Sequence, residues 1–248
     1  MNSKRLRVFA GPNGSGKSTL LKRIPETVPI GYYINADEIE KRLISGKGVN
    51  LNDFGISSGN ADLTSYFDHS VFATIKSDLG QLKSSFIILN GNLKTSDNGL
   101  LPKYSAAIIS DFIREEILKS GKSFSFETVM SHPDKLEFIK KADSLGYHVY
   151  LYYICTDDVI VNIQRVKTRV KEGGHDVPES KIRERYLRSL ELLYDSMKIC
   201  YKSYLFDNSN NAIEVARIDR DKKMYISVPR EKIPNWFIKY VLIKAGII

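Results

Sequence analysis

The sequence predicts an α/β fold built on a parallel β-sheet, and three observations point to it. Short apolar runs alternate with segments of helical periodicity along most of the chain. The most apolar run, residues 147–156, reads YHVYLYYICT and is typical of a strand that is covered on both faces. A glycine-rich loop joins the first apolar run to the first helical segment. Strands that alternate with helices form parallel sheets through right-handed crossovers, so we expect helices on both faces.

The composition is that of an ordinary globular protein. The chain has 248 residues, of which 42% are hydrophobic and 27% charged, and its formal net charge is +8. This charge favours an anionic partner, which could be a nucleic acid, a polyphosphate substrate or an acidic protein. Because the lysines and arginines are scattered and form no dense tract with aromatic residues, we disfavour nucleic acid as the partner.

Cysteine usage and hydropathy argue against a zinc protein, a disulfide-bonded protein and a membrane protein. Cys155 and Cys200 are the two cysteines, and no Cys/His spacing suits zinc, so we expect both thiols to be reduced and buried. No apolar run approaches the ~20 residues of a bilayer span, and the start of the chain lacks the apolar core of a signal peptide. We therefore expect no membrane contact and a cytoplasmic location.

The first third of the chain predicts two strand–helix units and an insertion. A strand at 6–10 precedes a helix at 17–24 that must stop before Pro25, and a strand at 32–35 precedes a helix at 37–44. From residue 45 to about residue 101 the pattern loosens, and glycine, asparagine and serine surround one strand-like run, FIIL. We interpret this segment as an insertion.

The later elements continue the alternation of helices and strands. A helix ending at Gly121 precedes a strand ending near Glu127, and Ser131 is expected to cap a helix that closes at Gly146. The remaining predicted elements are a strand at 147–156, helices at 157–171 and 179–198, a strand at 203–209, a hairpin at 212–229 and a helix at 234–246. We expect one domain over residues 1–210, with the insertion at about 45–101, and a small extension at 211–248 packed on the same domain.

The glycine-rich loop carries the most specific motif of the chain. Residues 11–18 read GPNGSGKS and fit GxxxxGK[ST] at every position, between a predicted strand and a predicted helix. A full match arises by chance in about one chain in a hundred of this length, so a glycine-rich turn without a ligand is the weaker explanation. The residues expected to bind the nucleotide are Gly11, Pro12, Asn13, Gly14, Ser15, Gly16, Lys17, Ser18 and Thr19.

This motif predicts how a nucleoside triphosphate is held. Its glycines let successive backbone N–H groups point at the phosphates, and the helix that follows adds the positive end of its dipole. Lys17 is expected to bridge the β- and γ-phosphates, and Ser18 to offer its hydroxyl to Mg²⁺. The predicted fold is therefore P-loop NTPase-like, with a parallel sheet, a helical lid and a small C-terminal hairpin and helix.

Among enzymes with this loop, the small-molecule kinases remain. A regulatory GTPase needs NKxD and DxxG motifs, and an ATP-driven motor normally shows an apolar strand ending in Asp-Glu; the chain has neither. The DFG at residues 53–55 lies in the insertion without an HRD-type catalytic loop, so coincidence explains it better than a protein kinase. A small-molecule kinase needs an acid that accepts the proton of the acceptor hydroxyl and lid arginines that neutralise the transferring phosphoryl.

The chain supplies candidates for both roles. Asp37 follows the second strand, at the carboxyl edge of the sheet where open α/β folds bind ligands, although it could instead be a helix cap or first-turn acid. Arg165 and Arg169 lie four residues apart and hence on one helix face. The helix after the GGHDVP loop carries Arg183, Arg185 and Arg188 off its apolar stripe. Two such helices could close over phosphates, or the arginines could form a solvated basic face.

Four segments together resemble the zeta toxin family of P-loop kinases, especially the branch with a Gly-Gly-His lid loop. The segments read AGPNGSGKST, INADEI, SFSFETVMSH and RVKEGGHDVPESKIRERYLRSLELL, in that order. The likeness covers roughly residues 4–43 and 104–209. Zeta toxins phosphorylate the sugar 3′-hydroxyl of UDP-N-acetylglucosamine with a nucleoside triphosphate and Mg²⁺, and a small epsilon antitoxin blocks their nucleotide site.

The resemblance implies roles for individual residues. Lys17 and Ser18 are similar to the phosphate lysine and the magnesium hydroxyl, and Asp37 to the general base. Glu127 and Thr128, at the end of the third predicted strand, are similar to the substrate-binding residues of the family. The lid arginines that stabilise transferred charge are similar to Arg169 and one of Arg183 or Arg185. The spacing leaves that choice open, and we assign Arg185 to catalysis and Arg183 to substrate binding.

The sequence thus predicts a kinase that uses ATP or GTP with Mg²⁺ to phosphorylate a small hydroxylated acceptor, such as a nucleotide sugar. The resemblance also implies an antitoxin protein as a partner. Two alternatives stay open: a nucleotide-binding regulatory protein without kinase turnover, and a kinase that acts on nucleic-acid ends. The insertion and the extension lie outside the resemblance, so the identity of the acceptor is not predicted.

Overall fold

The computed structural model describes residues 3–24, 28–96, 101–102, 104–174 and 176–248. His175 of the Gly-Gly-His loop lies outside the described residues. The chain forms two compact units, and we describe each by itself. The first unit comprises Met1–Pro29 and Ser125–Ile248, and the second comprises Ile30–Phe124.

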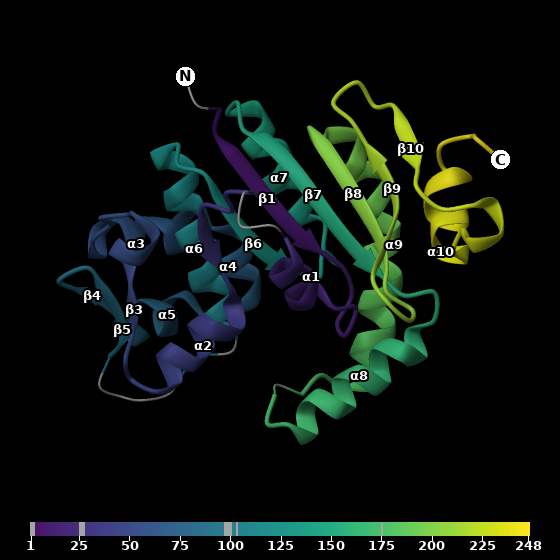
Figure 1. The fold of residues 1–248 in the computed structure, drawn as a ribbon. Coiled ribbons are helices and arrows are strands. Elements are labelled where there is room, and N and C mark those ends of the chain that lie inside the picture. Colours follow the sequence, from purple (N-terminus) through teal and green to yellow (C-terminus); the bar gives the residue numbers. More distant parts are fainter. Residues whose placement is uncertain (1–2, 25–27, 97–100, 103, 175) are drawn as a thin grey trace. The chain divides into compact units, whose positions relative to one another are not determined.

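A seven-stranded, mostly parallel sheet has the strand order β10-β9-β8-β7-β1-β6-β2 (Figure 1). Its last two strands in this order are β6 (Phe124–Thr128) and β2 (Tyr32–Ile34). At its centre β1 (Arg5–Ala10) pairs in parallel with β7 (His148–Cys155), which pairs in parallel with β8 (Lys202–Asp207). The predicted hairpin is confirmed as β9 (Ile213–Ile218) and β10 (Met224–Ile226), which run antiparallel. The predicted α/β class is confirmed, and the hairpin makes the sheet mixed at one edge.

Helices cover both faces of this sheet, as predicted. Successive strand residues point to opposite faces. On one face Tyr152 lies in a cluster with Leu20 of α1 (Lys17–Arg23). On the other face the hydroxyl of Tyr153 lies 3.1 Å from Ser189 Oγ of α9 (Glu179–Ile199). The neighbouring α7 (Asp134–Ser144) lies behind the sheet with α9 in Figure 1.

The prediction that β7 is covered on both faces is wrong at the amino-terminal end of the strand. His148 and Tyr150 are half-buried, although Tyr150 packs against the cluster that contains Leu20 of α1. Aromatic rings shield one another here instead: His148 stacks on Tyr201 at 4.1 Å, and the Arg7 guanidinium lies over the Tyr150 ring at 5.1 Å.

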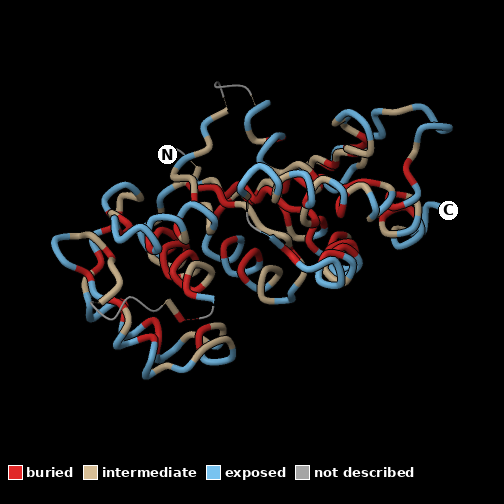
Figure 2. The backbone as a smooth tube through the Cα atoms, turned by 90° about the horizontal axis from the view of Figure 1, so that it is seen from below, coloured by how far each residue is buried: buried red, intermediate tan, exposed pale blue. Residues whose placement is uncertain are grey.

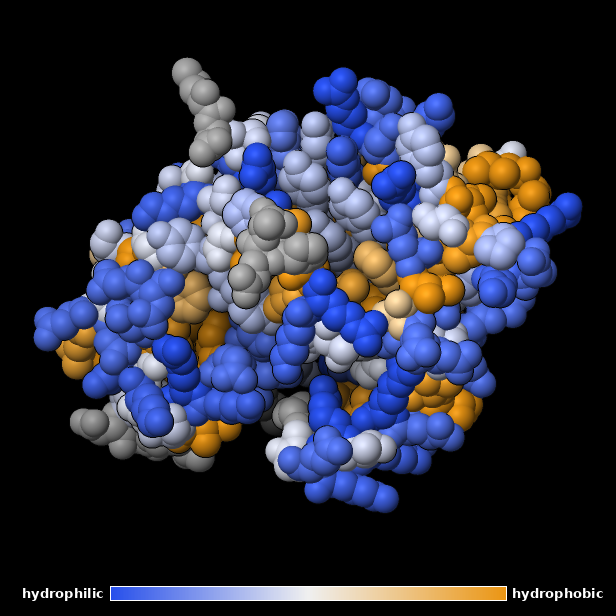
Figure 3. All heavy atoms as spheres, in the orientation of Figure 1, coloured by the Kyte–Doolittle hydropathy of each residue, from blue (hydrophilic) through white to orange (hydrophobic). Residues whose placement is uncertain are grey.

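Two helix boundaries differ from prediction. Pro133 caps α7, so Ser131 as the cap is wrong; proline is well suited to the start of a helix because its missing N–H would have no partner there. The predicted C-terminal helix is wrong as a regular α-helix. Its single turn α10 (Asn235–Phe237) continues into the wider π-helix η3 (Ile238–Leu242). Apolar atoms gather on the surface over this extension in Figure 3.

The extension is anchored to the carboxyl ends of the central strands. Trp236 Nε1 donates to Asp207 Oδ2 at 2.9 Å, and Trp236 N donates to Asp157 Oδ1 at 3.0 Å. Trp236 is 2% exposed, so the bond from its indole to Asp207 is shielded from water. The extension therefore contacts the loops that follow β7 and β8.

The second unit has its own antiparallel sheet and its own core. The sheet order is β3-β5-β4, and Figure 2 shows buried residues along the inner sides of the helices. Its core includes Leu51, Phe67, Leu82 and Leu93, each at most 2% exposed. Its elements are β2 (Tyr32–Ile34), α2 (Ala36–Ile44), β3 (Val49–Asn50), η1 (Leu51–Phe54), α3 (Asn60–His69), α4 (Val71–Lys76), α5 (Leu79–Ser85), β4 (Phe86–Leu89), β5 (Asn92–Thr95) and α6 (Ser105–Ser120). Part of the predicted loose insertion is thus ordered structure.

Cys155 and Cys200 are free thiols and fully buried, as predicted. Burial raises the pKa of the Cys200 thiol to about 12 and raises that of Cys155 as well, so neither is a reactive thiolate at neutral pH. Among the described residues, no helix is long and apolar enough to cross a bilayer.

Candidate functional site

The phosphate-binding loop joins β1 to α1 in the first unit, as the motif predicts. Gly11, Gly14 and Gly16 have φ angles of 145°, 76° and 101°. These angles favour glycine strongly, because a Cβ would strain the backbone there. α1 begins at Lys17, directly after the loop, so its N-terminal N–H groups face the loop.

Two asparagine side chains donate hydrogen bonds to backbone carbonyl oxygens of the loop. Asn162 Nδ2 donates to Asn13 O at 2.6 Å, and Asn208 Nδ2 donates to Ser15 O at 2.8 Å. A Cβ on Gly16 would lie 2.4 Å from Asn208 Nδ2, so glycine is needed there for space as well as for φ. Neither asparagine was predicted from the sequence, in which the one local signal is Asn162 itself, a polar residue within the apolar run VIVNI at 159–163.

Lys17 and Ser18 occupy the start of α1. Lys17 Nζ donates to Gly11 O and Pro12 O, both at 2.9 Å, so its ammonium group lies across the loop. Ser18 Oγ donates to Glu127 Oε2 at 3.0 Å, which joins the loop to the end of β6 (Phe124–Thr128). A hydroxyl beside a carboxylate is a pair of hard oxygen donors, the kind of ligand that Mg²⁺ prefers.

Thr128 holds the neighbouring backbone in place. Its carbonyl oxygen accepts from Gly11 N at 3.3 Å, and its Oγ1 accepts from Met130 N at 3.0 Å. Met130 has a φ of 52°, so this second bond stabilises a turn in the left-handed region. The predicted contact of Thr128 with substrate stays a prediction.

Asp37 lies in the first turn of α2, in the second unit. The cap of this helix is Asn35, whose Oδ1 accepts from Asp37 N at 2.9 Å and from Glu38 N at 3.4 Å. Asp37 is therefore a first-turn acid and not the cap. The phosphate loop belongs to the first unit, so the role of Asp37 as general base stays a prediction.

The predicted lid consists of α8 (Val159–Lys171) and α9. A shared apolar core of Ile163, Val166, Val177 and Ile182 packs the two helices together. Glu179 links them through charge: its Oε2 lies 3.3 Å from Lys167 Nζ, and its Oε1 accepts from Arg183 Nη2 at 2.8 Å. The bonds from Arg183 and Lys167 lower the pKa of Glu179.

The lid arginines differ in what they contact. Arg183 bonds to Glu179, and Arg188 Nη1 lies 2.9 Å from Glu184 Oε1. Arg185 is half-exposed, and no carboxylate of the described residues lies within ion-pair distance of it. Arg165 Nη2 donates to Ser209 O at 3.4 Å, while Arg169 lies in the last turn of α8 beside Gly174.

Comparison with known families supports the resemblance that the sequence predicted. Residues 92–210 match the zeta toxin family. This segment is just under half of the chain and contains Glu127, Thr128 and both lid helices. The phosphate-binding loop and Asp37 lie outside it. The predicted family resemblance is confirmed over the matched segment.

One protein of known sequence is similar to part of this chain. An uncharacterised protein of Haemophilus influenzae is 35% identical over 69 residues, which are 28% of this chain and 49% of that protein. The chain thus spans about half the length of this relative.

The crystal structure of the AvrRxo1-ORF1:-ORF2 complex matches 96% of this chain and 65% of its own, with a TM-score of 0.54 and 15% identity. The same complex with ATP matches 94% and 64%, also with a TM-score of 0.54 and 15% identity. At this identity the likeness shows that the fold is shared.

Proposed function

We propose that this chain is a kinase that transfers the γ-phosphoryl group of ATP or GTP to a hydroxyl of a small acceptor, such as a nucleotide sugar. The hydrogen bond between Ser18 Oγ and Glu127 Oε2, one residue from the phosphate lysine, carries the proposal. It joins the two oxygen donors that a nucleotide-bound Mg²⁺ needs. The zeta toxin match over residues 92–210 and a neighbour of the same fold with ATP support it.

Nucleotide binding is the part with the most support. The loop offers backbone N–H groups and the N-terminus of α1 to the phosphates, and Lys17 offers a positive charge at the same place. On binding, Lys17 would exchange the carbonyl oxygens of Gly11 and Pro12 for phosphate oxygens, and hydrogen bonds between charged groups are the stronger ones. Asn162 and Asn208 hold the loop, so less order is lost on binding.

Mg²⁺ would be held by Ser18, with Glu127 beside it, and would neutralise charge that develops on the phosphates. Glu127 was predicted to bind substrate, and its bond to Ser18 supports a role at the metal. Both roles require the carboxylate at the end of β6. A glutamine at this position would keep the shape of the side chain and remove the charge.

Asp37 is the proposed general base, and two arginines are the proposed charge stabilisers. Asp37 would accept the proton of the acceptor hydroxyl as the oxygen attacks phosphorus. Arg169 and Arg185 would neutralise the transferring group, and the lack of an ion pair at Arg185 among the described residues supports this choice. Arg183 would contact substrate after leaving Glu179, because a solvent-exposed ion pair of this kind is weak.

The two crystal structures of the AvrRxo1 complex contain two proteins each, which supports a partner protein for this chain as well. An antitoxin is the proposed partner. The need for nucleoside triphosphate favours the cytoplasm as the place of the reaction.

The test is transfer of label from the γ-phosphate to a panel of nucleotide sugars, other sugar phosphates and nucleic-acid ends. We expect a labelled small molecule with the wild-type protein and none with Lys17→Ala, which removes the phosphate lysine. Arg188→Ala is the matched control, because this arginine has no proposed role. Nucleotide binding without label transfer to any acceptor would instead support a regulatory protein, and label on nucleic acid alone would support an end kinase.

A further inference from the structure

One face of the large sheet is only partly covered at the amino-terminal ends of its central strands. On the face toward α7 and α9, Val149 and Leu151 are 0% exposed. On the face toward α1, the residues that alternate with these are half-buried, and Tyr150, Lys202 and Tyr204 are among them. Figure 3 is drawn from the side of α1, and pale and blue residues lie there over the upper ends of β7 and β8. We call this surface the tyrosine face and define it by Tyr150, Tyr201, Lys202, Tyr204, Arg217 and Tyr225.

The register of the strands places aromatic and cationic residues in a row across the tyrosine face. Tyr204 of β8 is paired with Tyr152 of β7 on one side and with Arg217 of β9 on the other. Arg217 is in turn paired with Tyr225 of β10. Residues directly opposite each other on neighbouring strands lie on the same face of a sheet, so the backbone fixes this row.

The tyrosine rings are held in place by stacking. The rings of Tyr204 and Tyr152 have their centroids 5.0 Å apart and an interplanar angle of 13°. Tyr201 stacks on His148 with a centroid distance of 4.1 Å and an angle of 7°. Tyr201 and Tyr204 are both half-buried and each ends a stack, so a further flat ring can extend either stack.

Positive charges lie at the same rings. Lys202 Nζ lies 6.0 Å from the centroid of the Tyr201 ring. At the other end of the face, the Arg217 guanidinium lies 5.7 Å from the centroid of the Tyr225 ring, and Lys223 Nζ lies 5.3 Å from it. Arg217, Lys223 and Tyr225 are exposed. The face therefore alternates aromatic rings with cations that reach solvent.

Two carboxylates near the tyrosine face already accept hydrogen bonds. Glu214 Oε1 accepts from Ser227 Oγ at 3.0 Å, and Asp219 Oδ2 accepts from the Tyr225 hydroxyl at 3.2 Å. Neither carboxylate forms an ion pair with Arg217 in the parts of the chain that the structure describes. The guanidinium of Arg217 can therefore bind an anion without breaking an ion pair.

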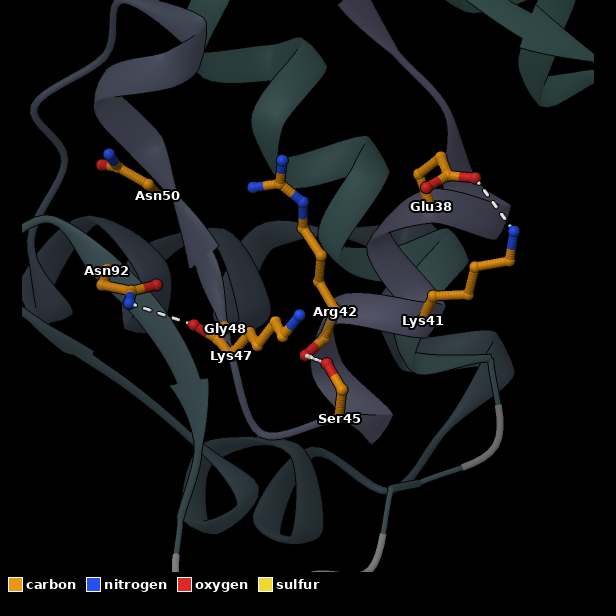
Figure 4. A pocket seen from close by; sticks show the side chains of 8 residues that line it. All are labelled: Glu38, Lys41, Arg42, Ser45, Lys47, Gly48, Asn50 and Asn92. Carbon is orange, nitrogen blue, oxygen red and sulfur yellow. Dashed lines mark hydrogen bonds and ion pairs between the residues drawn. The ribbon is translucent and has the colours of Figure 1, made fainter.

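The cations of a polar pocket in the second unit are different. This pocket lies between α2, the loop that follows it, and the strands β3 and β5 (Figure 4). Its Lys41 Nζ lies 3.0 Å from Glu38 Oε1, and Figure 4 shows the pair at its rim. An anion would have to compete with that carboxylate. Lys202 contacts an aromatic ring instead, and it forms no ion pair with a carboxylate of the described residues.

The combination of rings and cations selects the kind of ligand. Every base of a nucleic acid has a flat face that stacks on an aromatic ring, and each phosphate accepts hydrogen bonds from lysine or arginine. Bases are free to stack on a protein in a single strand, whereas in a duplex they stack on one another. The tyrosine hydroxyls can also bond to the 2′-hydroxyl, which RNA has and DNA lacks.

We propose that the tyrosine face binds single-stranded RNA, with bases stacked on Tyr201 and Tyr204 and phosphates at Lys202 and Arg217. These residues are scattered in the sequence, and the folded sheet brings them together. The binding is a property of the first unit and does not rest on the kinase activity proposed above.

Fluorescence anisotropy of a labelled oligouridylate of about 12 nucleotides, titrated with the full chain, tests the proposal. We expect a Kd of about 1–100 µM at physiological salt, and an affinity that falls as the salt concentration rises. Tyr201→Ala and Tyr204→Ala should each weaken binding by about tenfold, because each removes a stacking partner. Arg217→Ala should make the slope of log affinity against log salt shallower by about 0.7, the value for one phosphate of a single strand.

Matched controls come from the helices on the opposite face of the sheet. Tyr194 of α9 is half-buried, and Lys198 Nζ lies 5.0 Å from the centroid of its ring. Tyr194→Ala removes the same kind of ring beside the same kind of cation, so it should leave RNA binding unchanged. Lys140→Ala, on α7, should leave the salt slope unchanged.

Three results would overturn the proposal: no binding at about 100 µM protein, equal binding of a thymidine DNA strand or of duplex RNA, or wild-type affinity in both tyrosine variants. Tyr204→Phe keeps the ring and removes the hydroxyl, so it should retain binding and reduce the preference for RNA over DNA. Unfolding of a variant is detected by its thermal transition. If a tyrosine variant unfolds, Arg217→Ala, at an exposed position, decides the outcome through its salt slope.

The phosphate-binding loop is a competing site for RNA phosphates and is tested separately. Lys17→Ala and saturating ATP should both leave RNA binding unchanged. If either one abolishes it, the RNA occupies the loop and the assignment to the tyrosine face is wrong. Loss of label transfer in Lys17→Ala with RNA binding retained would show that the two sites are independent.

Discussion

The two units of the chain differ in how their functional groups are built. In the first unit a continuous motif, GPNGSGKST, forms the phosphate-binding loop, and the side-chain amides of Asn162 and Asn208 donate hydrogen bonds to it. In the second unit short helices and short strands bring together a polar pocket from residues 38 to 92. Phosphate binding depends on backbone geometry that a short motif can encode, whereas the pocket depends on side chains from separate elements.

The largest effect is expected at Gly16, where the loop has no space for a Cβ atom. Gly16→Ala places a Cβ 2.4 Å from Asn208 Nδ2 and strains a φ of 101°, so we expect nucleotide affinity to fall by about 100-fold. Gly146→Ala is the control: its φ is 80° but nothing lies within 4 Å of the added Cβ. Titration with a fluorescent nucleotide measures both, and equal affinities would break the contrast between a constrained loop and an open turn.

The next effect concerns the metal. Glu127→Gln should weaken apparent Mg²⁺ affinity, measured by calorimetry with the bound nucleotide, by about tenfold, because a charged oxygen next to Ser18 is lost. Glu137→Gln, on the exposed part of α7, is the matched control. Unchanged Mg²⁺ affinity in Glu127→Gln would contradict a role of Glu127 at the metal and leave only its predicted role in substrate binding.

A smaller effect is expected from the amides that hold the loop. Asn208→Ala removes the bond to Ser15 O, so the nucleotide KM should rise by about tenfold while kcat changes less. Asn211→Ala, three residues further on and exposed, is the control. An equal loss of kcat and kcat/KM, with no change in KM, would contradict a role in holding the loop.

The smallest effect is on stability at alkaline pH, and both thiols responsible lie in the first unit. Burial raises the pKa of Cys200 from 9.0 to about 12, so the unfolded chain loses this proton at lower pH than the folded chain. The contribution to stability is complete below pH 9.0 and is lost as the pH rises toward about 12.

Urea unfolding between pH 8 and 10, at about 1.4 kcal/mol per pKa unit, measures this loss. Cys200→Ala should flatten the dependence, and an identical slope in this variant would show that the thiol does not contribute.

The parts of the fold that were predicted well are those with a strong local signal. β1, the loop and α1 follow directly from an apolar run, a motif and a proline that stops the helix, and α6 ends at Gly121 as its αL glycine requires. The long helix α9 shows the predicted buried stripe, which includes Ile182, Tyr186 and Leu190. In each case one element contains enough periods, or a specific enough stop signal, to be recognised.

The remaining elements depend on contacts that are distant in sequence. α4 and α5 have six and seven residues, too few for a helical period to stand out, so the insertion was interpreted as loose. Ser18 and Glu127 are 109 residues apart and meet through the folded sheet. We find no sequence signal for the π-helix η3 or for the hydrogen bond from Asn208 to the loop.

We propose that Asp37 accepts the proton of an acceptor hydroxyl while the loop holds the triphosphate. The most direct measurement is label transfer from γ-labelled ATP, compared between the wild-type protein and Asp37→Asn, with nucleotide affinity determined in parallel. We expect Asp37→Asn to lose label transfer by about 100-fold or more, with nucleotide affinity unchanged within about twofold. Full transfer by Asp37→Asn would contradict it.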